Sequence, residues 1–131
     1  MAITAPSARD RGIQLLREGS VADSVDFFLQ ALAEDPTNVD LYLLLGVAYS
    51  RMGQNDKSVD ILGQAVELAP ASARVHYNLG VAYHKASNLT LAKDEYARAT
   101  TLDPNYVVAK SALEFVAKES PDQPGELSVD G

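Results

Sequence analysis

Apolar residues recur every three or four positions over most of the chain, which is the spacing of an amphipathic α-helix, and short segments with glycine or proline interrupt the pattern. No stretch alternates between apolar and polar residues for long enough to predict a strand. The pattern therefore predicts seven helices joined by short connectors. We expect them at about residues 7–18, 20–34, 39–52 and 55–68, as two helices that meet near Asn88 between Ser72 and Leu102, and as a last helix from Asp103 to about Lys118.

Residues that favour helix N-termini lie at several of the expected starts. Ser20 and Asp23 resemble a capping box, with Asp in place of the usual Glu. Asp103 and Pro104 combine an N-cap residue with a proline in the first helical position, which favours a helix start there. Further N-cap residues are expected at Ser72 and Asn88.

The helical pattern repeats with a period of 34 residues. The pentapeptide Leu45–Tyr49 returns letter for letter as Leu79–Tyr83. Prolines and alanines mark the same interval, at Pro36, Pro70 and Pro104 and at Ala31, Ala65 and Ala99. A period of this length is typical of stacked helical hairpins. Such a stack presents an open surface and no preformed catalytic pocket, so the repeat favours a binding function.

Composition and charge narrow the classes of function. The chain has 131 residues, about one domain, and a net charge of −7. An acidic chain repels nucleic acid and anionic membranes, so we expect no nucleic-acid partner. The first residues lack the long apolar run of a signal peptide or membrane helix, and we expect a cytoplasmic protein without membrane insertion. The expected domains are a flexible N-terminus at 1–4, a repeat domain at 5–118 and an acidic disordered tail at 119–131.

Residues that could perform chemistry are few. The chain has no cysteine, and its two histidines, His76 and His84, lie too far apart along a helix to share a metal easily. We interpret His76 as a packing residue and His84 as a polar residue of the surface or of a groove. Paired carboxylates such as Asp94 and Glu95 predict a solvated helix face, and no glycine-rich phosphate loop is present. We therefore expect no enzyme activity, no catalytic residues, no metal and no cofactor.

The repeated residues resemble the tetratricopeptide repeat family over about residues 5–118. In that family a large aromatic residue precedes Leu-Gly by three positions, and a tyrosine follows the glycine by three. The second repeat fits with Tyr42, Leu45, Gly46 and Tyr49, and the third fits with Leu79, Gly80 and Tyr83, with His76 in place of the aromatic residue. A small residue, a bulky residue, alanine and proline follow in each second helix, for example Ser58, Leu62, Ala65 and Pro70.

This resemblance implies an all-α, right-handed superhelix of three helix-turn-helix repeats plus a C-terminal capping helix. The repeats would be 5–38, 39–72 and 73–106, and the capping helix would extend to 118. Gly46 and Gly80 would let helices approach closely, with Phe28 and Tyr96 among the side chains that fill larger gaps. In the last helix Glu114 takes the place of the close-packing glycine, as expected for a helix that faces solvent.

The resemblance also implies that the first helices of successive repeats line a concave groove for a partner. Residues one period apart then form rows across it. The apolar rows are Ile13, Val47 and Val81, and Leu43 with Tyr77; the basic row is Arg17, Arg51 and Lys85; Asn78 and His84 add hydrogen-bonding groups. We expect this groove to bind a partner peptide with apolar anchors and some acidic groups. A simpler interpretation of the basic row is that cations are favourable near helix C-termini.

The expected role is thus an interaction module that binds a protein or peptide partner, as an adaptor, scaffold or assembly chaperone. The alternative is a self-associating scaffold that acts through its end faces, and the expected state is a monomer or a weak homo-oligomer. Residues that could dock on a second copy, or else cover the last repeat, are Val107, Val108, Phe115 and Val116. The carboxylate clamp of chaperone-binding family members is poorly matched, since only Arg9 and Asn78 are compatible with it.

Overall fold

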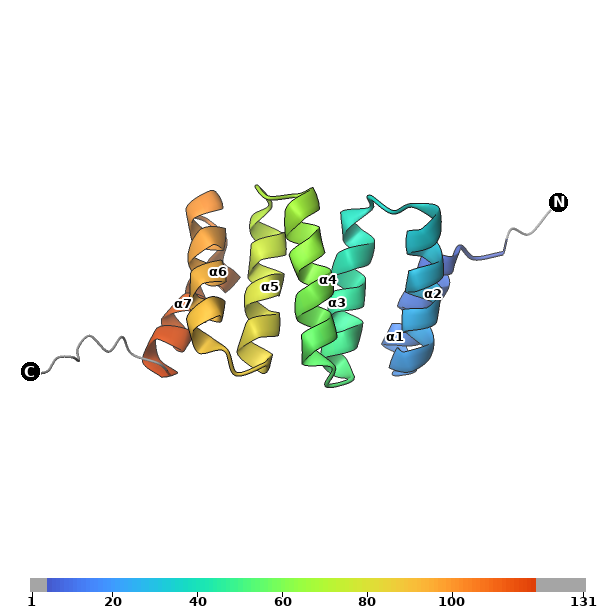
Figure 1. The fold of residues 1–131 in the computed structure, drawn as a ribbon, viewed down its shortest axis with the longest axis horizontal. Coiled ribbons are helices and arrows are strands. Elements are labelled where there is room, and N and C mark those ends of the chain that lie inside the picture. The colour runs from blue at the N-terminus through green and yellow to red at the C-terminus, as the bar shows by residue number, and fades with distance from the viewer. Residues whose placement is uncertain (1–4, 120–131) are drawn as a thin grey trace, which may run out of the picture. The chain divides into compact units, whose positions relative to one another are not determined.

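The computed structural model describes residues 5–119, and every regular element in this range is an α-helix (Figure 1). The helices are α1 (Ala8–Arg17), α2 (Val21–Glu34), α3 (Val39–Arg51), α4 (Asn55–Leu68), α5 (Ala73–Lys85), α6 (Leu89–Leu102) and α7 (Val107–Glu119). The predicted all-α, helical-repeat fold is confirmed. The predicted N-terminus at 1–4 and nearly all of the predicted tail, 120–131, lie outside the described residues.

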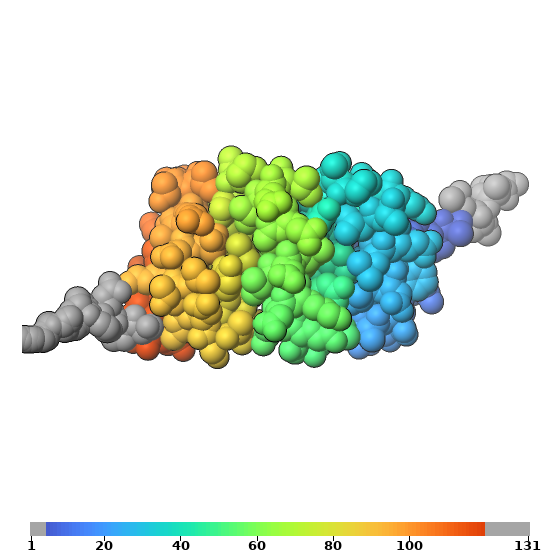
Figure 2. Space-filling model, viewed as in Figure 1, coloured from blue at the N-terminus to red at the C-terminus, as the bar shows by residue number. Residues whose placement is uncertain are grey.

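The helices form two compact units, unit 1 (Met1–Pro70) with α1 to α4 and unit 2 (Ala71–Gly131) with α5 to α7. In the view of Figure 2, side chains of α2 and α4 face the viewer in unit 1, and those of α6 cover most of α7 in unit 2. None of the described helices has the length and apolar character needed to cross a membrane.

The boundaries of the helices keep the predicted period of 34 residues. The first helices α3, α5 and α7 begin at 39, 73 and 107, and the second helices α2, α4 and α6 begin at 21, 55 and 89. The N-cap residues predicted at Ser72 and Asn88 are confirmed, because their side chains accept from the N–H groups of Val75 and Leu91.

Two predicted helix starts are wrong in detail. The last helix begins at Val107 and not at Asp103, which instead ends α6. The Asp103 carboxylate accepts from the N–H of Asn105 at 3.0 Å and so forms a turn that contains Pro104. Ser20 precedes α2, as predicted, but its side chain makes no capping hydrogen bond, so the expected capping box does not form.

The turn inside each hairpin has one residue in the left-handed region. Gly19 and Gly53 have φ of 88° and 75°, and Ser87 occupies the same place in the third hairpin with φ of 63°. In each case the next N–H bonds back to a carbonyl five residues earlier, for example Asn88 to Tyr83 at 2.9 Å. Glycine adopts this conformation without strain, whereas a side chain costs about 1–2 kcal/mol. The third turn is therefore strained.

Each hairpin is closed by a glycine on the first helix that faces a large side chain on the second. A Cβ atom added at Gly46 would lie 2.6 Å from Leu62 Cγ, and one at Gly80 would lie 2.6 Å from Tyr96 Cδ1. Gly12 meets Phe28 in the same way in the first hairpin. The close helix contacts predicted at Gly46 and Gly80 are confirmed.

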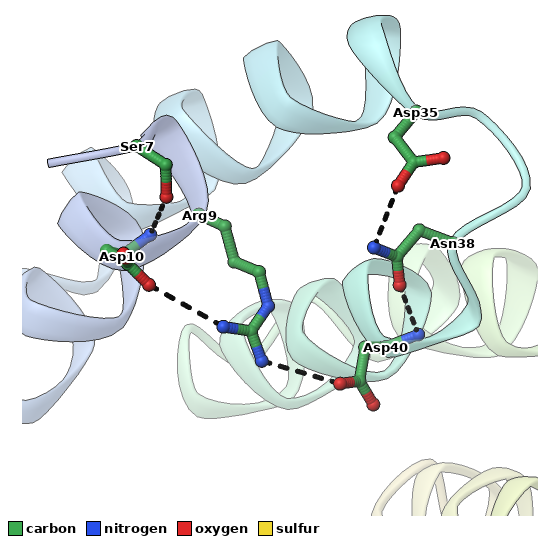
Figure 3. A network of polar contacts seen from close by, with 6 residues as sticks. All are labelled: Ser7, Arg9, Asp10, Asp35, Asn38 and Asp40. Carbon is green, nitrogen blue, oxygen red and sulfur yellow. Dashed lines mark hydrogen bonds and ion pairs between the residues drawn. The ribbon is translucent and has the colours of Figure 1, made fainter.

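A polar network ties the start of α1 to the start of α3 within unit 1 (Figure 3). The Arg9 guanidinium lies 3.4 Å from the Asp40 carboxylate and 3.6 Å from that of Asp10. The Asn38 side chain donates to Asp35 and accepts from the Asp40 N–H, which caps α3. Arg9, one of the two residues compatible with a carboxylate clamp, is therefore used within the fold.

Candidate binding surface

The first helices of unit 1 contact each other and present part of the predicted apolar row. Ile13 on α1 is half-buried, and Val47 on α3 is 39% exposed although its neighbours Gly46 and Ala48 are buried. Leu43 is only 5% exposed, so its side chain belongs to the core. The surface of α1 and α3 therefore offers Ile13 and Val47 to a partner, but hardly Leu43.

The basic residues of unit 1 lie at helix C-termini. Arg17 and Arg51 are in the last turns of α1 and α3, and both are exposed. The Arg51 guanidinium donates to the backbone carbonyl of Leu16 at 3.2 Å, close to the end of α1. This contact supports the simpler interpretation of the basic row, in which positive charge compensates the carbonyl end of a helix. Arg17 makes no such bond among the described contacts.

Aromatic side chains from three helices form a connected cluster in unit 2. The ring of Tyr77 lies 5.8 Å from that of Tyr96 and 5.5 Å from that of Tyr106. The His84 ring lies 6.4 Å from Tyr96 and 5.8 Å from Phe115. Tyr96 is 2% exposed and anchors the cluster, whereas Phe115 is 55% exposed. We call these five residues the aromatic cluster; it brings the predicted residues Tyr77 and His84 together with α7.

The other predicted residues of unit 2 are partly engaged within the fold. Val81 is half-buried and packs against the core around Val116. The Asn78 amide donates to the Arg74 carbonyl at 2.8 Å, inside α5. Lys85 is exposed in the last turn of α5.

His84 links α5 to the last residue of α7. Its Nε2 atom lies 2.7 Å from the Glu119 carboxylate, and its Nδ1 atom lies 3.5 Å from the Tyr96 hydroxyl. Burial raises the pKa of Tyr96 to about 12, with smaller contributions from Tyr77 and Glu119. Burial and the neighbouring Tyr77 also raise the pKa of Tyr106. Both phenols are therefore neutral near pH 7.

A buried ionisable pair lies on the far side of α5 from this cluster's exposed part. His76 and Glu95 are 5% and 6% exposed, and His76 Nδ1 lies 2.7 Å from the Glu95 carboxylate, which also accepts from Arg98 at 2.8 Å. The expected packing role of His76 agrees with its burial. The expectation that Glu95 lies on a solvated face is wrong, because His76 and Arg98 supply the partners that a buried carboxylate needs.

Sequence reasoning gave Phe115 a different place. It lies one period after Val81 and so continues the row of Ile13, Val47 and Val81. The same spacing would have assigned it to the candidate surface. Of the residues predicted to dock or cover at the C-terminal end, Val116 is fully buried and covers the core, whereas Val107, Val108 and Phe115 are 68%, 52% and 55% exposed.

Chemistry by a metal finds no support in the described residues, where no group of three or more His, Cys, Asp or Glu side chains could hold an ion. The arrangement is instead that of a contact surface, with exposed apolar and aromatic side chains held on rigid helices.

The family of the chain is shown by comparison with known proteins. Two family profiles described as tetratricopeptide repeat match residues 43–107 and 15–67. No curated protein sequence matches the chain.

Solved structures show the same fold. The first tetratricopeptide repeat domain of Spaghetti (RPAP3), bound to the HSP90 peptide SRMEEVD, has a TM-score of 0.82 at 21% identity, over 92% of this chain and 100% of that one. The first such domain of human RPAP3 has a TM-score of 0.80 at 22% identity, over 85% and 87% of the two chains.

A crystal structure of MamA has a TM-score of 0.76 at 28% identity, over 86% of this chain. The present chain spans 61% of that MamA chain, which is less than two thirds of its length. Because both family profiles fall on hairpins in which a glycine receives a large side chain from the second helix, the chain belongs to the tetratricopeptide repeat family.

Proposed function

We propose that the protein is a non-catalytic interaction module that binds a segment of a partner protein on its first helices, as an adaptor, scaffold or assembly chaperone. The observation that carries this proposal is the exposure of apolar side chains at one repeat position. Val47 on α3 is 39% exposed and Phe115 on α7 is 55% exposed, while the adjacent residues Ala48 and Val116 are fully buried. Apolar side chains that a rigid core holds at the surface are typical of interaction sites.

The structural relatives support a binding role. The RPAP3 domain that shares the fold is bound to a peptide of HSP90. The carboxylate clamp is not part of the proposal, because Arg9 pairs with Asp40 and the Asn78 amide donates within α5.

Site-specific photo-crosslinking tests the proposal on the full chain. A photoreactive amino acid at Val47 or at Phe115 should capture one discrete partner in an extract of the source cells. The controls are Leu29 and Leu102, which are each 43% exposed on the second helices α2 and α6. The purified partner should then bind the Val47→Ser or the Phe115→Ser variant more weakly than the unchanged protein. Equal crosslinking at all four positions, or unchanged affinity in both variants, would contradict a first-helix site.

Charge variants on unit 1 need a careful choice of residue. Arg51→Glu removes a bond to the Leu16 carbonyl and so changes stability as well as charge. Arg17→Glu is the cleaner variant, since Arg17 is exposed at the end of α1.

Self-association through α7 is the second candidate function, and the exposure of Val107 and Val108 favours it. Light scattering of the full chain should then show a mass that rises with concentration in the micromolar range. Val107→Ser together with Val108→Ser should restore a monomer. A strict monomer for the unchanged chain would remove this candidate and leave the first proposal intact.

A further inference from the structure

Helix α7 has two exposed faces of different character. Glu114 lies one period after Gly80, on the side where a second helix would pack, and both Glu114 and Lys110 are exposed. Val107, Val108 and Phe115 are also exposed, and at 3.6 residues per turn they lie within a sector of about 100° on a neighbouring side. The helix is therefore polar where another hairpin helix would dock and apolar beside it.

The apolar side of α7 continues onto α5. Phe115 lies beside His84, and Tyr106, which directly precedes α7, lies beside Tyr77. Val108 is two turns before Phe115 on the same side of the helix. We call the surface formed by Tyr77, His84, Tyr106, Val108 and Phe115 the α5–α7 face.

The charge of the chain is distributed unevenly between its units. Residues 5–70 contain five Lys and Arg against ten Asp and Glu, whereas residues 71–119 contain six against five. Helix α5 has no acidic residue, and it has Arg74 in its first turn and Lys85 in its last. A negatively charged segment is therefore repelled by the surface charge of unit 1 and is favoured along α5.

We infer that the α5–α7 face binds an acidic segment of another protein that carries an apolar side chain between its carboxylates. This inference rests on the proposed function and names the class of partner segment. The apolar side chain packs on Phe115 and Val108, and the carboxylates lie toward Arg74 and Lys85. These two residues are about 16 Å apart along the helix axis, a span that about five extended residues cover.

Two labelled synthetic peptides test the inference against the full-length protein by fluorescence anisotropy. Both have a leucine midway between two charged residues five positions apart; the charges are glutamates in one peptide and lysines in the other. The glutamate peptide should bind, with an affinity that falls as salt is added, and the lysine peptide should not. Phe115→Ser and Arg74→Glu should each lower the affinity at least tenfold, as expected for a residue at the centre of a small interface.

Leu102→Ser is the matched control, because Leu102 is a similarly exposed apolar residue on α6. It should leave the affinity unchanged, and circular dichroism should show that both serine variants retain the helical fold. Equal binding of the two peptides, or full affinity of the Phe115→Ser variant, would overturn the inference. If the crosslinked partner depends on Val47 and not on Phe115, the interaction function stands and the α5–α7 assignment falls.

Two other occupants of the face would also overturn the inference. The first is the chain's own acidic end: affinity that is gained only when Asp122→Asn, Glu126→Gln and Asp130→Asn are combined would identify it. The second is another copy of the chain, which would be identified by a dimer that Phe115→Ser dissociates.

Discussion

A single methyl group at the first-helix glycine decides whether a hairpin can close. A Cβ atom at Gly46 would overlap the side chain of Leu62, so we expect Gly46→Ala to lower the free energy of unfolding by about 1–3 kcal/mol, measured by urea denaturation. Gly63→Ala is the matched control in the same unit, since a Cβ atom there meets nothing within 4 Å. It should raise stability by up to about 1 kcal/mol through helix propensity. Changes of the same sign in both variants would contradict the contact.

Tyr96 makes stability depend on pH in the alkaline range. Its pKa in the folded state is raised from 10.0 to about 12, so unfolding releases the phenol proton more easily than folding retains it. The stabilisation is complete below pH 10 and is lost as the pH rises toward 12. The free energy of unfolding should therefore fall in this window, and Tyr96→Phe should flatten the slope. A slope that is identical in both proteins would exclude Tyr96 as its origin.

Single residues were predictable from sequence where the repeat supplies a template. Gly46 and Gly80 occupy family positions, and their contacts follow from them. The burial of Glu95 was not predictable in this way, because its partner His76 is 19 residues away and the second repeat has the uncharged Tyr42 and Ile61 at the two positions. The signal was the histidine itself, which stands where an aromatic residue is expected and needs a polar partner when buried.

At the scale of elements, most helix boundaries follow from glycine, proline and N-cap residues. The start of α7 did not, because Asp followed by Pro favours a helix start and a turn equally well. In the structure the Asp103 carboxylate accepts from Asn105 and the helix waits until Val107. The period would have decided the matter, since α3 and α5 begin 34 residues apart and the next step leads to 107.

Helix α7 covers the core of unit 2 with only one of its sides. Val116 is fully buried in that core, while Val107 on the same helix is 68% exposed. We expect Val116→Ala to lower the free energy of unfolding by about 2 kcal/mol, and Val107→Ala to change it by less than about 0.5 kcal/mol, both by urea denaturation. Similar losses in the two variants would mean that α7 does not pack in this orientation.

At the scale of the molecule, sequence reasoning identified the kind of surface better than its members. The row of Ile13, Val47 and Val81 came from the period alone, and Phe115 extends it onto α7. Leu43 has the same spacing as its neighbours but is buried, because spacing along a helix does not report what packs over a side chain. Contacts such as that of His84 with Glu119, 35 residues apart, also depend on packing that no local pattern encodes.

The glycine contacts bear on how this chain can change its amino acids over time. Phenylalanine, leucine and tyrosine fill one and the same recess in three hairpins, at Phe28, Leu62 and Tyr96. The recess is made by the absence of a side chain opposite, so it accepts bulky groups of different shape. Mutational drift can therefore exchange the second-helix residue from one repeat to another, whereas the glycine that faces it has no substitute.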